Sequence, residues 1–162
     1  MAKKLREGDI FSIQISEDQY SVGCVASRWR KEFYFVLFEE IFQFSHLPES
    51  VFGLTPCIAS SSLDAKIHHG HWVVYANDSN EVNFPQPLYK VEESTGYVVE
   101  SFDRKTRYKL NRENAGNFKY RKCVAPVRLE KAIKAFHGFE EWVEMFDELR
   151  YERLVFSILG DI

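Results

Sequence analysis

The amino-acid sequence predicts an α+β fold made mainly of antiparallel β-sheet, with amphipathic helices toward its C-terminal end. Three observations predict this fold class. Short apolar runs of strand type recur between residues 10 and 110, turn-forming residues separate them, and helical spacing of apolar residues begins only at residue 129. We therefore expect strands that could curl into a barrel-like N-terminal part, followed by helices.

Residues 10–16 and 20–26 predict the first antiparallel hairpin, because both are strand-like and the polar residues 17–19 can turn the chain between them. Gly23, inside the second run, indicates a bulge or a close approach of neighbouring groups. Residues 33–38 are apolar on both alternating faces, which predicts a central strand covered on both sides. Residues 39–44 are expected to prolong this strand.

Residues 45–64 contain two prolines, a glycine and three consecutive serines, which predicts a connecting loop. Strand character returns at residues 72–75. Residues 97–102 and 106–110 then predict a second hairpin around residues 103–105.

Two helices are predicted after residue 128. The first ends at Gly138, a natural helix stop, and the second is expected to bury one apolar face while a row of acidic residues faces solvent. The apolar positions of the first helix are Leu129, Ile133 and Phe136, and those of the second are Phe139, Trp142, Val143, Phe146 and Leu149.

The composition predicts one ordered domain over residues 1–162. The chain has 24 acidic and 21 basic residues, a net charge of −3 and 45% hydrophobic residues, and a chain of this length can bury a core without metal or disulfide. No apolar run has the length of a signal or membrane-spanning segment, so we expect a cytoplasmic protein without a membrane partner. Its three cysteines lack paired spacing, which predicts reduced and mostly buried thiols.

Histidines 68, 69 and 71 form a dense group of possible metal ligands, with His46 and Cys57 upstream. Their spacing matches neither the helical zinc signature nor a finger-type site, which favours a polar turn over a metal centre. Motifs for an activated nucleophile or for phosphate binding are also absent from the sequence. We therefore expect no cofactor and no catalytic residue.

A basic stretch runs from Arg104 to Lys122. Eight basic residues, one acid and three interleaved aromatic rings could bind single-stranded nucleic acid, since cations contact its backbone and rings stack on its bases. No recognised nucleic-acid motif accompanies them, which favours a solvated sheet face instead. The basic residues are Arg104, Lys105, Arg107, Lys109, Arg112, Lys119, Arg121 and Lys122, the acid is Glu113, and the rings are Tyr108, Phe118 and Tyr120.

An acidic stretch follows within the second predicted helix. Five acids within nine residues would present a carboxylate surface suited to a basic protein, although charged outer faces are also ordinary on amphipathic helices. These five candidate partner-binding residues are Glu140, Glu141, Glu144, Asp147 and Glu148.

The opening residues 8–15 (Gly-Asp-Ile-Phe-Ser-Ile-Gln-Ile) and 20–25 (Tyr-Ser-Val-Gly-Cys-Val) resemble the immunity protein 26 family of bacterial polymorphic-toxin systems. The likeness continues through residues 70–74 and 87–89 and covers the chain loosely from residue 8 to about 90. The resemblance implies a single immunity-protein-like domain that is not an enzyme. Such a protein binds a cognate toxin domain and occludes its active site. If the toxin is a basic nuclease, the acidic stretch is its natural contact.

Two alternatives stay open at this point. The same resemblance also allows a small metal-dependent hydrolase of phosphotriesterase type, for which the histidine group would be the metal site. The basic stretch allows a single-stranded nucleic-acid-binding module, although we do not expect nucleic acid as the main partner.

Overall fold

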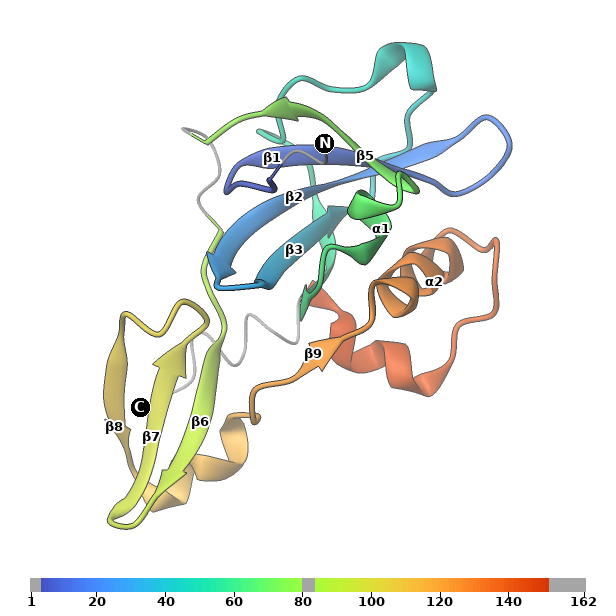
Figure 1. The fold of residues 1–162 in the computed structure, drawn as a ribbon. Helices are drawn as coiled ribbons and strands as arrows, with labels where there is room; N and C mark the ends of the chain where they lie inside the picture. The colour runs from blue at the N-terminus through green and yellow to red at the C-terminus, as the bar shows by residue number, and fades with distance from the viewer. Residues whose placement is uncertain (1–3, 80–83, 152–162) are drawn as a thin grey trace.

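The computed structural model describes residues 4–79 and 84–151 of the chain. Within them, strands form a six-stranded sheet in the order β5-β1-β2-β3-β4-β9 and a three-stranded sheet in the order β6-β7-β8 (Figure 1). The strands are β1 (Asp9–Gln14), β2 (Tyr20–Trp29), β3 (Glu32–Phe38), β4 (Pro56–Ser62), β5 (Trp72–Asn77), β6 (Leu88–Glu93), β7 (Gly96–Ser101), β8 (Arg107–Leu110) and β9 (Cys123–Val124). The helical elements are η1 (Phe44–His46), α1 (Ala65–His68), η2 (Arg112–Asn117), α2 (Pro126–Phe136) and η3 (Glu144–Leu149).

The α+β class with mainly antiparallel strands is confirmed. Both predicted hairpins are present, as β1 with β2 and as β7 with β8. The larger sheet is open, with β5 at one edge and β9 at the other, so its strands do not close into a barrel. No helix in the described parts of the chain is long and apolar enough to span a membrane.

The strand β3 runs between β2 and β4 and is covered on both faces. Alternate side chains of a strand point to opposite faces, so its six consecutive apolar residues feed two separate cores. Phe33, Phe35 and Leu37 belong to a first core, and Tyr34, Val36 and Phe38 belong to a second. The predicted central strand is confirmed.

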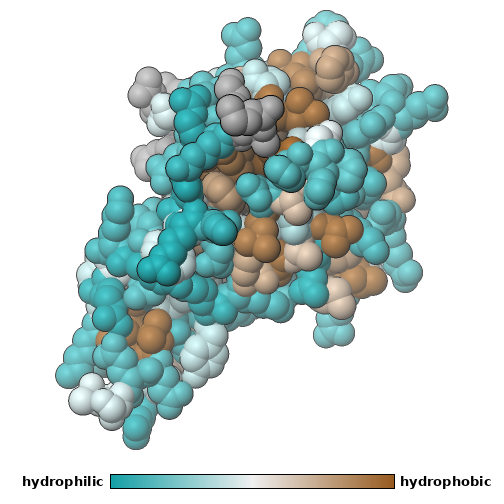
Figure 2. Space-filling model, in the orientation of Figure 1, coloured by the Kyte–Doolittle hydropathy of each residue, from teal (hydrophilic) through white to brown (hydrophobic). Residues whose placement is uncertain are grey.

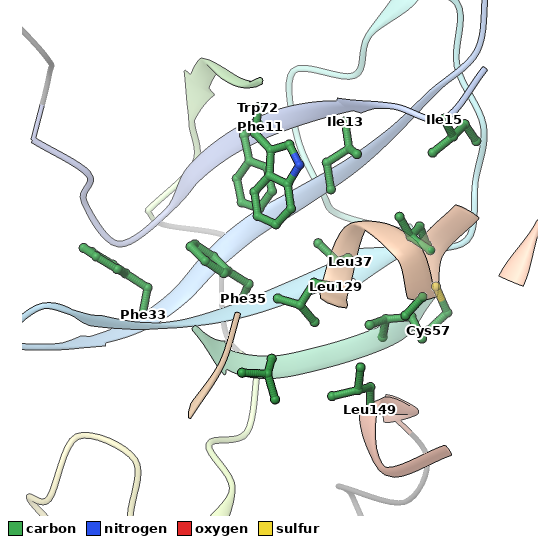
Figure 3. Packing of buried hydrophobic residues seen from close by; sticks show 14 of the residues in the cluster. Phe11, Ile13, Ile15, Phe33, Phe35, Leu37, Cys57, Trp72, Leu129 and Leu149 are labelled. Carbon is green, nitrogen blue, oxygen red and sulfur yellow. The ribbon is translucent and has the colours of Figure 1, made fainter. Parts of the chain in front are cut away.

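The first core lies between the larger sheet and the C-terminal elements α2 and η3. Trp72 stacks on Phe11 with ring centroids 5.3 Å apart and an interplanar angle of 5°. Leu129 of α2 and Leu149 of η3 close this core from the other side, as Figure 3 shows. The apolar spacing of α2 thus buries one face of the helix against the sheet.

The second core joins the two sheets. Tyr89 of β6 and Phe102, which follows β7, pack against Tyr34, Val36 and Phe38 of β3. In Figure 2 apolar residues gather over the larger sheet, whereas the smaller sheet at the lower left is mostly hydrophilic. The smaller sheet therefore packs against the larger one mainly through the apolar residues of the second core.

A charged network supports that junction. The carboxylate of Glu100 lies 2.9 Å from Nη2 of Arg121, 3.3 Å from Nε of Arg104 and 3.4 Å from Nε of Arg107. Arg121 also donates to the carbonyl oxygens of Ser101 and Phe102 at 3.1 and 3.0 Å. One half-buried carboxylate thus holds three guanidinium groups at the base of the smaller sheet.

At Gly23 of β2, neighbouring side chains approach the backbone closely. A glycine inside a strand predicts either a bulge or such a close approach. A Cβ at this position would lie 2.5 Å from Cδ2 of Leu37 and 2.7 Å from Cζ of Phe11, both buried in the first core. The register shift between β2 and β3 falls later, between Val25 and Ser27. Glycine is thus required here for space between the strands.

We expect Gly23→Ala to lower the free energy of unfolding by about 1 to 3 kcal/mol, because the added methyl group overpacks a filled core. Denaturant unfolding measures this change. Gly116→Ala is the matched control, since a Cβ there would meet no atom within 4 Å. Equal stability of Gly23→Ala and the wild type would contradict the close approach.

The predicted loop over residues 45–64 is wrong in its second half, because it contains β4. Ser61 and Ser62 are buried in this strand, where their hydroxyl groups donate to Oε1 of Glu32 at 3.2 Å and to the carbonyl oxygen of Val124 at 2.7 Å. These tertiary bonds replace the local ones that make serine a turn former. Residues 39–44 also do not prolong β3, and only Phe42 forms a bridge there, to Tyr20.

The second predicted helix is wrong as well. After Gly138, with φ of 83°, residues 139–143 are not helical, and within residues 139–149, the span of the predicted helix, only the 3₁₀ element η3 forms. Like charges four residues apart, such as Glu140 with Glu144, disfavour an α-helix. The spacing of Phe146 and Leu149 fits a 3₁₀ turn equally well, and both residues are buried.

Candidate functional site

Residues 139–145, which follow α2 and include the first two residues of η3, form a largely exposed surface that we call the acidic–apolar segment. Phe139 is 45% exposed and Met145 is 55% exposed, although sequence spacing placed Phe139 on the buried face of a helix. The neighbouring carboxylates of Glu140, Glu141 and Glu144 are also exposed, and no ion pair joins them to any described residue. The segment thus presents large apolar side chains beside uncompensated negative charge.

The segment is held in place by Trp142. Its indole packs against Phe146 with ring centroids 5.5 Å apart, and its Nε1 donates to Oδ1 of Asp147 at 3.0 Å. The guanidinium of Arg150 lies 4.0 Å from the centre of the indole ring. Because Phe146 is buried in the first core, these contacts fix the segment to the body of the protein.

Asp147 and Glu148, the other two predicted partner-binding residues, make contacts within the chain. Asp147 lies 3.5 Å from Nε of Arg150. Glu148 pairs with Lys122 and lies 3.9 Å from Nη1 of Arg128. Of the five predicted acids, Glu140, Glu141 and Glu144 therefore carry the charge that faces outward without a partner in the described chain.

The predicted basic stretch divides in two. Arg104, Arg107, Arg121 and Lys122 pair with acids of this chain, mainly at the junction of the two sheets. The other four basic residues are exposed, and these are Lys105, Lys109, Arg112 and Lys119. Of the three aromatic rings, Tyr108 and Tyr120 are exposed, whereas Phe118 is buried in a small core with residues of β7 and β8. Half of the basic stretch thus stabilises the fold, which leaves less free charge than the sequence suggests.

Histidines 68, 69 and 71 lie exposed around the turn between α1 and β5. The ring centroids of His68 and His69 are 5.3 Å apart, and those of His69 and His71 are 6.4 Å apart. His46 is exposed on η1 with Nδ1 2.9 Å from Oγ of Ser45, while Cys57 is buried. Among the residues that the structure describes, no three histidine, cysteine or acidic side chains are placed to hold one metal ion.

The three cysteines differ in burial, but the pKa of each thiol is raised. Cys24 and Cys57 are buried as predicted, whereas Cys123 is exposed. Burial raises the pKa of the Cys57 thiol to about 12, and it raises the pKa values of Cys24 and Cys123 as well. All three thiols are therefore protonated near neutral pH, which disfavours their use as nucleophiles.

Comparisons of the chain with family models, with curated proteins and with solved structures gave no match.

Proposed function

We propose that this chain is an immunity protein that neutralises a cognate bacterial toxin domain by covering its active site. The observation that carries the proposal is the acidic–apolar segment, where exposed Phe139 and Met145 lie beside three carboxylates that pair with no described residue. The sequence resemblance of residues 8–90 to immunity protein 26 supports the same function. The partner that fits this surface is a basic protein, such as a nuclease domain.

The two kinds of side chain in the segment have different roles in the proposed contact. Large apolar groups supply affinity when a partner buries them, and aromatic and methionine side chains are enriched at such interfaces. Unpaired carboxylates attract a basic surface over several ångströms and so raise the association rate. Because Trp142 fixes the segment to the core, little conformational entropy is lost on binding.

The charge of the segment is tested by the double reversal Glu141→Lys/Glu144→Lys. With the cognate toxin domain as partner, we expect the association rate constant at low salt to fall on the order of tenfold, because two attractive charges become repulsive. Stopped-flow fluorescence or surface plasmon resonance measures this rate. The difference from the wild type should shrink as salt is added.

The matched control is Glu17→Lys/Asp18→Lys, which changes the net charge equally at an exposed turn of the β1–β2 hairpin. It should slow association much less, because these residues lie outside the proposed contact. Co-production of the wild-type chain should also restore growth of cells that make the toxin module. Equal rates for both double variants, or no restored growth, would overturn the proposal.

A further inference from the structure

A cavity of about 460 Å³ lies where the two sheets meet. Within the described chain it is bounded by the edge of β4, the start of β6, residues 116–124 and the end of η3. We call it the inter-sheet cavity. Its volume is within the range of pockets that hold one small organic molecule.

One part of the cavity wall is apolar. Leu88, Phe118, Val124 and Leu149 line it, and Leu88, the one of the four that is not fully buried, offers most of their accessible surface. Such a wall favours an apolar group over water, because water there lacks hydrogen-bond partners. The cavity can therefore hold the apolar body of a ligand.

The other part of the wall is cationic. Lys90, Lys119 and Lys122 line the cavity, and Glu148 is the one acidic residue among its described lining residues. Glu148 pairs with Lys122, while Nζ of Lys90 donates to the carbonyl oxygen of Ala115 at 3.1 Å. Lys119 is exposed and pairs with no acid in the described chain. The lining thus has two more positive than negative charges.

The edge of β4 adds backbone groups to the same cavity. Ile58 bridges to Arg150 and Ser61 pairs with Cys123, but Ala59 and Ser60 between them have no strand partner on this edge within the described chain. Both of these residues line the cavity. Of the two, Ser60 is only partly buried and can offer polar groups to a ligand, whereas Ala59 is fully buried.

From these three features we infer that the inter-sheet cavity binds one small organic anion, with its apolar body against Leu88 and its acidic group toward Lys119. The site is separate from the acidic–apolar segment and does not depend on the proposed toxin. Glu148, one of the five candidate partner-binding residues, also pairs with Lys122 at the cavity wall. The bound class is a single molecule with an apolar ring or chain and a carboxylate, sulfonate or phosphate group.

Two fluorescent probes with the same apolar body test both halves of this inference. 8-Anilinonaphthalene-1-sulfonate carries a negative charge, and N-phenyl-1-naphthylamine is its neutral counterpart. We expect the anionic probe to bind the full chain at one site, on the order of tenfold more tightly than the neutral one at low salt, since the excess lysine charge favours the anion. No saturable binding, or equal affinity for both probes, would overturn the inference.

Two variants locate the site. Gly116→Phe should weaken binding of the anionic probe at least about tenfold, because Gly116 lines the cavity and has open space where a side chain would project. Lys119→Ala should remove most of the preference for the anion, whereas Lys109→Ala, an exposed lysine of β8, should not. Circular dichroism and thermal unfolding confirm that each variant is folded. Unchanged binding in Gly116→Phe would place the probe elsewhere and contradict the assignment.

Discussion

Replacing Trp72 with alanine should lower the free energy of unfolding by about 3 to 5 kcal/mol, the loss expected for truncating a large buried aromatic residue. Trp72 is 1% exposed, stacks on Phe11 and meets the edge of Phe35 with ring centroids 5.9 Å apart. Its Nε1 donates to Oε1 of Glu130 at 3.1 Å, which ties β5 to α2. Trp72→Ala would leave a cavity in the first core and would also remove the hydrogen-bond donor to Oε1 of Glu130.

Urea unfolding of three variants separates these contributions. Trp72→Phe keeps an aromatic ring against Phe11 but loses the bond to Glu130, so a smaller loss of about 1 to 2 kcal/mol is expected. Trp142→Ala removes a half-buried indole and should also cost less than Trp72→Ala. A loss below about 1 kcal/mol for Trp72→Ala would contradict the position of this residue at the centre of the first core.

The second large effect is expected at Glu100. Glu100→Ala should destabilise the protein by about 2 to 4 kcal/mol, because Arg121 keeps its half-buried charge after losing its acidic partner. The side chains of Glu100 and Arg121 are 14% and 18% exposed, so solvent only partly compensates. The smaller sheet should loosen first, since its junction with the larger sheet depends on this network.

Denaturant unfolding measures the loss, and hydrogen exchange of β6, β7 and β8 shows where it acts. Glu92→Ala is the matched control, because Glu92 is an exposed acid of the same sheet. The control should change stability by no more than about 0.5 kcal/mol. If Glu100→Ala and Glu92→Ala lowered the free energy of unfolding by similar amounts, the three guanidinium contacts of Glu100 would contribute little to stability.

The elements that sequence predicts well are those whose pattern reflects a single local cause. The first hairpin follows from two strand-like runs around a polar turn, and β3 follows from unbroken apolar alternation. The end of α2 follows from Gly138, whose φ of 83° suits glycine. These features need no knowledge of distant residues.

The elements that sequence predicts poorly depend on partners far along the chain. The hydroxyl group of Ser62 in β4 donates a hydrogen bond to the carbonyl oxygen of Val124, 62 positions away. Residues 139–149 have helical spacing, but α2 ends at Phe136, just before Gly138, and Phe146 is buried in the first core. Neither partner can be identified from the local pattern.

The candidate site was predicted in part. The acidic residues were recognised, and Glu140, Glu141 and Glu144 are exposed. The pairing of Glu148 with Lys122 could not be foreseen, because it joins the acidic stretch to the basic one across 26 positions. Nor does the sequence pattern show that Phe139 and Met145 face solvent, since helical spacing assigns apolar residues to a buried face.

The central claim is that the acidic–apolar segment contacts a basic toxin domain. Hydrogen–deuterium exchange of the full chain, alone and in complex with the proposed toxin domain, tests this claim most directly. We expect binding to slow exchange of the backbone amides of residues 139–145, and to do so far less in Glu141→Lys/Glu144→Lys at the same toxin concentration. A complex that protects other surfaces and leaves residues 139–145 unchanged would contradict the claim.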